Sequence, residues 1–197
     1  MTFIQVCNKG DMLLEVDKLS GEFRLTYNMT DLRRLNIREF LSFKIYDLIK
    51  RLNPDLIDDI QIIKEHSDEE IDVFFKFKNI AKELGMRQRC MLLKTIRTTD
   101  DSDPIDIKVV FKARSLTAGE IQELAFPEKN ILNQYSVLTC EFADIYIEIQ
   151  GSDIKMRYNF LIRMQEELPQ YMENMIGLMM KKIFYNVKRF VDRLEEE

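Results

Sequence analysis

The stretch IYIEIQGSDIKMRYNFLIRM, residues 145–164, decides the fold. Apolar side chains occupy every second position up to Gln150, and the same alternation resumes after Gly151-Ser152-Asp153 and continues to Met164. A period of two places apolar side chains on one face of a β-strand, and a short glycine-containing turn between two such runs is typical of a hairpin. The stretch therefore predicts a long antiparallel hairpin, whose first strand we expect to begin near Val137.

A long amphipathic segment follows the hairpin at Leu168-Pro169. Proline is favourable in the first turn of a helix because its missing amide would have no partner there. Apolar residues then recur at spacings of three and four, at Leu168, Met172, Met175, Met179, Ile183, Val187, Phe190 and Leu194. This pattern predicts a helix over residues 168–195, and at ~1.5 Å per residue such a helix is about 40 Å long, enough to cross a sheet.

More strands are expected before the hairpin, at residues 60–64, 71–78, 87–97 and 105–114, of which the last alternates most clearly. Thr117 and Glu120 form a capping box that predicts a short helix over residues 118–124. Residues 60–165 are therefore expected to form an antiparallel sheet. Phe74 falls on the nominally polar face of its strand, and we expect either the N-terminal strands or a protein partner to cover it.

The N-terminal part reads as a β-meander over residues 1–27, with strands near 3–7, 12–16 and 23–27. A helical segment is expected over residues 30–53, in which apolar residues share one face from Ile37 to Leu52. Asn53-Pro54 ends it, because proline disfavours helical geometry in the residue before it. Without a linker-like stretch, residues 1–197 are predicted to form a single α+β domain. Its antiparallel sheet, of about six to nine strands, packs against the long C-terminal helix and a second helix at about 37–52.

Composition limits where this protein can be located and what it can bind. The start has no basic region followed by an apolar run, and no apolar stretch approaches the ~20 residues that a membrane-spanning helix needs. The three cysteines are far apart and lie in strand-like segments, so we expect reduced thiols and a cytoplasmic location. The net charge of -5 argues against broad non-specific nucleic-acid binding but leaves a local RNA contact open.

The sequence carries no recognisable catalytic motif, cofactor-binding fingerprint or set of metal ligands at workable spacing. Its single histidine, His66, stands in an acidic run that we expect to be a solvated loop. We therefore expect a binding protein without catalytic residues, cofactor or metal.

Two surfaces on the C-terminal helix are candidates for binding. The first is an apolar face wider than one seam against a sheet requires, which either is buried in the core or contacts a ligand or partner. Its candidate residues are Met172, Met175, Met179, Met180 and Phe184. The second is a basic set that is either a solvated helix face or a patch for acidic protein, anionic lipid or RNA phosphate. Its candidate residues are Lys181, Lys182, Lys188, Arg189 and Arg193.

From Phe23 onward, the order of helix, antiparallel strands and long final helix resembles the helix-grip fold of the START-like and birch-pollen-allergen-like superfamily. The resemblance is one of element order, and no diagnostic motif accompanies it. It implies a curved sheet that wraps the final helix around an apolar cavity. The residues favour a protein-interaction subunit or regulatory factor of a larger assembly. The resemblance implies the alternative, a carrier or sensor of a lipid or other apolar ligand between the sheet and the final helix.

Overall fold

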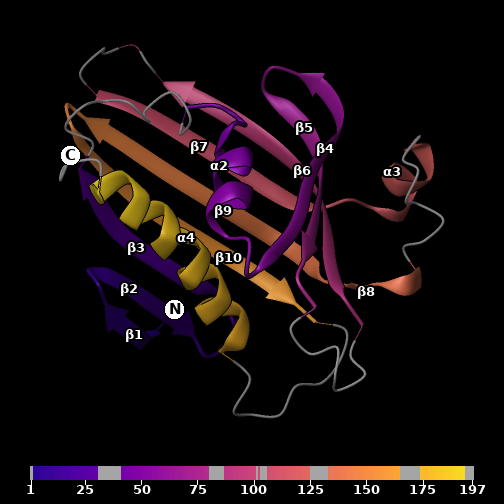
Figure 1. Cartoon of the computed structure of the whole chain (residues 1–197), viewed down its shortest axis with the longest axis horizontal. Helices are drawn as coiled ribbons and strands as arrows, with labels where there is room; N and C mark the ends of the chain where they lie inside the picture. Colours follow the sequence, from indigo (N-terminus) through magenta and orange to yellow (C-terminus); the bar gives the residue numbers. More distant parts are fainter. Residues whose placement is uncertain are drawn as a thin grey trace.

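The computed structural model describes residues 2–30, 41–79, 87–100, 102, 106–124, 133–164 and 174–193, the last without the side chain of Arg193. Within these ranges, ten strands form one sheet (Figure 1). The strands are β1 (Phe3–Lys9), β2 (Met12–Asp17), β3 (Phe23–Thr30), β4 (Ile57–Ser67), β5 (Glu70–Phe77), β6 (Arg89–Asp100), β7 (Asp106–Ser115), β8 (Ser136–Val137), β9 (Thr139–Gln150) and β10 (Asp153–Arg163). The helices are α2 (Ile45–Leu52), α3 (Ala118–Glu123) and α4 (Met175–Arg193). The α+β class and the helix near the C-terminus are confirmed.

The sheet is built around the predicted hairpin. β9 and β10 pair antiparallel from Asp153 opposite Gln150, so Ile154 faces Ile149 across the ladder. The strand order is β1-β2-β3-β10-β9-β7-β6-β5-β4, and only the short β8 pairs parallel, with β6. β3 therefore joins the other side of β10, which places the N-terminal meander at one edge of the sheet and β4 at the other.

α4 and α2 lie on the same face of the sheet and contact each other (Figure 1). The main core fills the space between this face and the two helices. α4 approaches the sheet closely at Gly177, where a Cβ would lie 2.5 Å from a ring carbon of Phe23. Phe23 in turn stacks on Phe160, with ring centroids 5.3 Å apart. The absence of a side chain at residue 177 is what allows this close packing.

A second, smaller apolar cluster lies on the opposite face of the sheet. Phe74 is fully buried there, packed with Cys90, Leu92 and residues that flank α3. Glu120 and Thr117 form the predicted capping box, in which the Thr117 amide donates to the Glu120 carboxylate at 2.8 Å. The expectation that the N-terminal strands cover Phe74 is wrong, because those strands pair at the β3 edge and the connection between β7 and β9 covers it instead.

Several element bounds differ from the sequence-based expectation. β4 runs to Ser67, so His66 lies in a strand and not in the solvated loop that we expected. Pairing of Ser67 with Glu70 moves the turn to the two residues between them. The His66 Nε2 lies 2.8 Å from an oxygen of Asp72, a buried carboxylate on β5. In the predicted helical segment 30–53, Thr30 belongs to β3 and residues 41–44 form turns, so the helix begins only at Ile45. The predicted helical residues 31–40, 168–173 and 194–195 lie outside the described residues.

A candidate apolar ligand site

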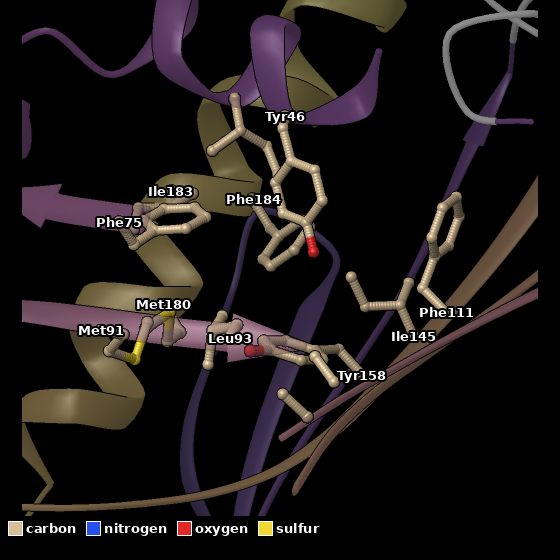
Figure 2. Close-up of a pocket in the computed structure, with 13 residues that line it drawn as sticks. Tyr46, Phe75, Met91, Leu93, Phe111, Ile145, Tyr158, Met180, Ile183 and Phe184 are labelled. Carbon is tan, nitrogen blue, oxygen red and sulfur yellow. The ribbon is translucent and has the colours of Figure 1, made fainter. Parts of the chain in front are cut away.

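A cavity of about 50 Å³ lies between the sheet, α2 and α4 (Figure 2). Its walls are almost entirely apolar. They are formed by Tyr46, Ile49, Phe75, Met91, Leu93, Phe111, Ala113, Ala143, Ile145, Tyr158, Met180, Ile183 and Phe184.

Strand periodicity explains how five strands contribute to one cavity. Alternate residues of β5, β6, β7, β9 and β10 point to the same face, which is the face that the two helices cover. α4 contributes Met180, Ile183 and Phe184, spaced three and four residues apart on one helix face. α2 contributes Tyr46 and Ile49 in the same way. The helices therefore form the roof of the cavity and the sheet forms its floor.

Two small side chains produce the empty space. Ala113 of β7 and Ala143 of β9 are direct partners across the ladder, and both line the cavity. The next inward positions on the same strands carry larger side chains, such as Phe111 opposite Ile145. Because cores otherwise pack without voids, adjacent alanines between large neighbours leave a gap under the helices.

Two tyrosine hydroxyls lie at this cavity. Tyr46 shares a 2.8 Å hydrogen bond with the fully buried Thr95 Oγ1, and burial raises the pKa of Tyr46 to about 12. Burial also raises the pKa of Tyr158 well above its ordinary value, so both side chains are neutral at physiological pH. Among the described residues, none is hydrogen-bonded to the Tyr158 hydroxyl, whose oxygen points into the cavity beside Leu93 in Figure 2.

This arrangement is suited to binding an apolar molecule. Among the described residues, none with a carboxylate lines the cavity, and the nearby Cys140 is a neutral thiol because burial raises its pKa to about 12. In the described ranges, no three His, Cys, Asp or Glu side chains gather where they could hold a metal ion. A hydroxyl such as that of Tyr158 can hydrogen-bond one polar atom of an otherwise apolar ligand.

The cavity is small. About 50 Å³ is close to the space of one or two water molecules, whose share of liquid volume is about 30 Å³ each. Pockets for small organic ligands are typically about 300–1,000 Å³. A lipid-sized ligand therefore needs more space than this cavity offers.

The structure distributes the predicted apolar residues unevenly. Met180 and Phe184 line the cavity, whereas Met175 and Met179 are half-buried elsewhere on α4. Met172 lies outside the described residues. The two tyrosines were not assigned to the site from the sequence, although Tyr158 stands in the inward-facing row of its strand and Tyr46 lies beside Ile45 on the buried face of its helix.

The predicted basic residues also separate. Lys182 and Arg189 are exposed and line a groove together with Lys9, whereas Lys181 is buried beside the same groove. Lys188 forms an ion pair with Asp192, with 2.6 Å between nitrogen and oxygen. The side chain of Arg193 lies outside the described residues.

Several solved structures have a fold similar to that of this chain. The human StarD13 lipid transfer and protein localization domain matches with a TM-score of 0.69 and 10% identity, over 95% of this chain and 88% of that chain. The chain has the START-like helix-grip fold. Human STARD10 matches with a TM-score of 0.72 and 7% identity, over 98% of this chain and 74% of the STARD10 chain. Human StAR-related lipid transfer protein 5 matches with a TM-score of 0.67 and 9% identity, over 99% of this chain and 88% of that chain.

The resemblance predicted from element order is thus confirmed at the level of the helix-grip fold. No family model matches the sequence, and no curated protein matches it either. The helix-grip fold is therefore recognisable in three dimensions at an identity too low for these sequence comparisons. None of the described helices is both long enough and apolar enough to cross a membrane.

Proposed function

We propose that this protein binds a lipid or another largely apolar molecule between the sheet and α4. The observation that carries the proposal is the apolar cavity under α4, where the Ala113 and Ala143 pair leaves space and the Tyr158 hydroxyl is unpaired among the described residues. Its support includes the two helix-grip neighbours whose names state lipid transfer. Of the two functions expected from the sequence, this favours the apolar-ligand carrier over the protein-interaction subunit.

The polar groups at the cavity suggest what the ligand carries. Tyr46 and Thr95 satisfy each other, whereas the Tyr158 hydroxyl has no hydrogen-bond partner among the described residues and lies in an apolar surrounding. A ligand with one hydroxyl or carbonyl group on an apolar body would complete this hydrogen bond. The net contribution of such a bond is about 0.5–1.5 kcal/mol.

The two helices that cover the cavity are hydrogen-bonded to each other. The Asn53 side chain donates to the Ile49 carbonyl of α2 at 2.8 Å and to the Ile183 carbonyl of α4 at 3.3 Å. Asn186 of α4 donates back to the Asn53 side-chain oxygen at 2.9 Å. The Asn53–Ile183 and Asn186–Asn53 bonds therefore join the end of α2 to α4.

The test is a fluorescence titration with cis-parinaric acid, in parallel with native mass spectrometry of the purified chain for co-purified apolar molecules. Wild-type protein should bind the probe saturably. Ala143→Val adds two methyl groups inside the cavity and should weaken binding about tenfold or more, which corresponds to about 1.4 kcal/mol. The matched control is Ala118→Val on the exposed start of α3, which should bind as wild type does. Equal binding by Ala143→Val and wild type, or no saturable binding by wild type, would contradict the proposal.

A second titration tests the role of Tyr158. Bound probe is displaced with 1-decanol and with decane, in wild type and in Tyr158→Phe. The preference for the alcohol should shrink by roughly three- to tenfold in the variant, because one hydrogen bond is lost. An unchanged preference would show that the hydroxyl does not contact the ligand.

A further inference from the structure

A groove of about 410 Å³ runs along α4 where this helix passes the β1–β2 turn. It is separate from the apolar cavity, and the two share no lining residue. Four cationic residues line it, namely Lys9, Lys181, Lys182 and Arg189. No carboxylate belongs to its lining in the described part of the chain, although the whole chain has a net charge of -5. The groove is therefore a local concentration of positive charge on an acidic protein.

Lys181 is the unusual member of this set, because its side chain is buried, with the residue only 8% exposed. Its Nζ donates to the Cys7 sulfur at 3.1 Å and to the Lys9 carbonyl oxygen at 3.2 Å. Neither contact is an ion pair with a carboxylate, and Lys181 has no ion pair among the described residues. A buried charge is costly without a counterion. An ammonium group has three donors, and the described residues accept only two of them, so the third is available for a ligand in the groove.

The wall of the groove is built by close packing. Gly10 in the β1–β2 turn has a φ of +62°, and a Cβ there would lie 2.9 Å from the Tyr185 ring. The guanidinium of Arg189 lies over the same ring, 5.7 Å from its centroid. Tyr185 therefore touches the turn on one side and positions Arg189 on the other.

Lys188, on the same helix but outside the groove, has its charge neutralised by a carboxylate, whereas the described residues offer none to the cations that line the groove. Lys188 forms its ion pair with Asp192 one helical turn away, at 2.6 Å. Lys182 and Arg189 have no such partner within the described ranges. The unmatched positive charge of α4 thus collects along the groove.

We propose that this groove binds the phosphate group of an anionic phospholipid headgroup. Several cations around one space favour a group with multiple anionic oxygens over a single carboxylate, and the guanidinium fork matches phosphate geometry. The phospholipid source follows from Leu178, a large apolar residue that lines the same groove and is 46% exposed. An exposed leucine beside basic residues suits the boundary between headgroups and acyl chains. This inference does not depend on the apolar cavity.

The experiment is co-sedimentation of the full chain with phosphatidylcholine vesicles, with and without phosphatidic acid. Wild type should bind the anionic vesicles at least tenfold more tightly, and raised salt should weaken binding. The double variant Lys182→Ala/Arg189→Ala should lose about tenfold or more of this affinity, because each basic residue near an anionic surface contributes about 1 kcal/mol. The charge-matched control is Lys64→Ala/Lys112→Ala, exposed lysines on β4 and β7, away from β1 in the sheet order. It should bind as wild type does.

Lys181→Met separates a ligand role from a structural one. Because the buried Lys181 ammonium has no ion pair among the described residues, removing it should leave the melting temperature measured without vesicles equal or higher. Vesicle binding should fall nonetheless. Retained binding in this variant would overturn the role of Lys181, and if the variant does not fold, the double variant still decides the proposal.

Four results would overturn the site itself. One is equal loss of binding in the double variant and its control, because binding would then follow net charge alone. Another is stabilisation by soluble glycerol phosphate without vesicle binding, which would identify a free phosphate as the ligand. A third is binding of poly-glutamate in place of vesicles, which would identify an acidic protein segment. The fourth is equal binding to vesicles with and without phosphatidic acid.

Discussion

The Tyr46 hydroxyl and the Thr95 hydroxyl lie 2.8 Å apart and join α2 to the middle of β6. Thr95 is fully buried. Among the described residues, Tyr46 is the only hydrogen-bond partner of its hydroxyl. The Tyr46 ring also packs edge-on against Phe75, with centroids 5.8 Å apart. One side chain therefore both fixes the helix on the sheet and lines the cavity.

We expect Tyr46→Phe to lower the free energy of unfolding by about 1–2 kcal/mol, because it leaves the buried Thr95 hydroxyl without a partner. Tyr46→Phe/Thr95→Val removes both hydroxyls and should recover part of that loss. Urea denaturation of the two single variants and the double variant measures the coupling. Strictly additive losses would show that the two hydroxyls do not interact.

Asn53→Ala should destabilise the protein by about 2 kcal/mol or more, because it removes the buried side-chain hydrogen bonds that join α2 to α4. Asn53 is 1% exposed, whereas its partner Asn186 is only half-buried. Asn186→Ala should therefore cost less, because water can replace its amide. Thermal melts of both variants test this order, and a larger loss for Asn186→Ala would contradict it.

Gly177→Ala should destabilise the protein by about 1–3 kcal/mol through overpacking against Phe23, although alanine favours helix by about 1 kcal/mol over glycine. The matched control is Gly119→Ala in α3, where a Cβ would meet nothing within 4 Å. This control should be neutral or stabilising. Melting temperatures compare the two, and a stabilising Gly177→Ala would mean that α4 sits further from the sheet.

Acid should unfold the protein partly through Asp58. Its carboxylate lies 3.0 Å from both Lys76 and Lys78, and hydrogen bonds from these lysines lower its pKa from 3.8 to about 2. A lowered folded-state pKa gives stability that is present above the unfolded value and is lost as the pH falls from about 4 to about 2. Asp58→Asn should flatten this part of the curve of unfolding free energy against pH, measured by urea denaturation. Parallel curves for variant and wild type would exclude this role.

Local patterns predicted those features that depend on a few consecutive residues. The β9–β10 hairpin follows from the alternation around Gly151, and the capping box follows from the chemistry of Thr117 and Glu120. His66 was misassigned because its acidic neighbours resemble a loop, while pairing of β4 with β5 extends the strand through it. That pairing is a property of two segments together.

The candidate site could be predicted only in part. Met180 and Phe184 could be predicted, because the apolar face of the final helix is wider than contact with one sheet requires. The Ala113 and Ala143 pair was invisible, because two isolated alanines acquire meaning only when the register of β7 and β9 places them opposite each other. In the sequence, Lys181 does not differ from its basic neighbours, because its burial depends on contact with the β1–β2 turn.

The sequence alone determined the order of the elements and which face of each is apolar, because side-chain periodicity is a local property with a fixed period. Only the tertiary structure decided where space remains between those faces and which charges lose their solvent. Both depend on the contact of residues far apart in the chain, such as Lys181 with Cys7 and Asn53 with Ile183. Packing across such distances is set by the register and approach of whole elements, and no single segment encodes it.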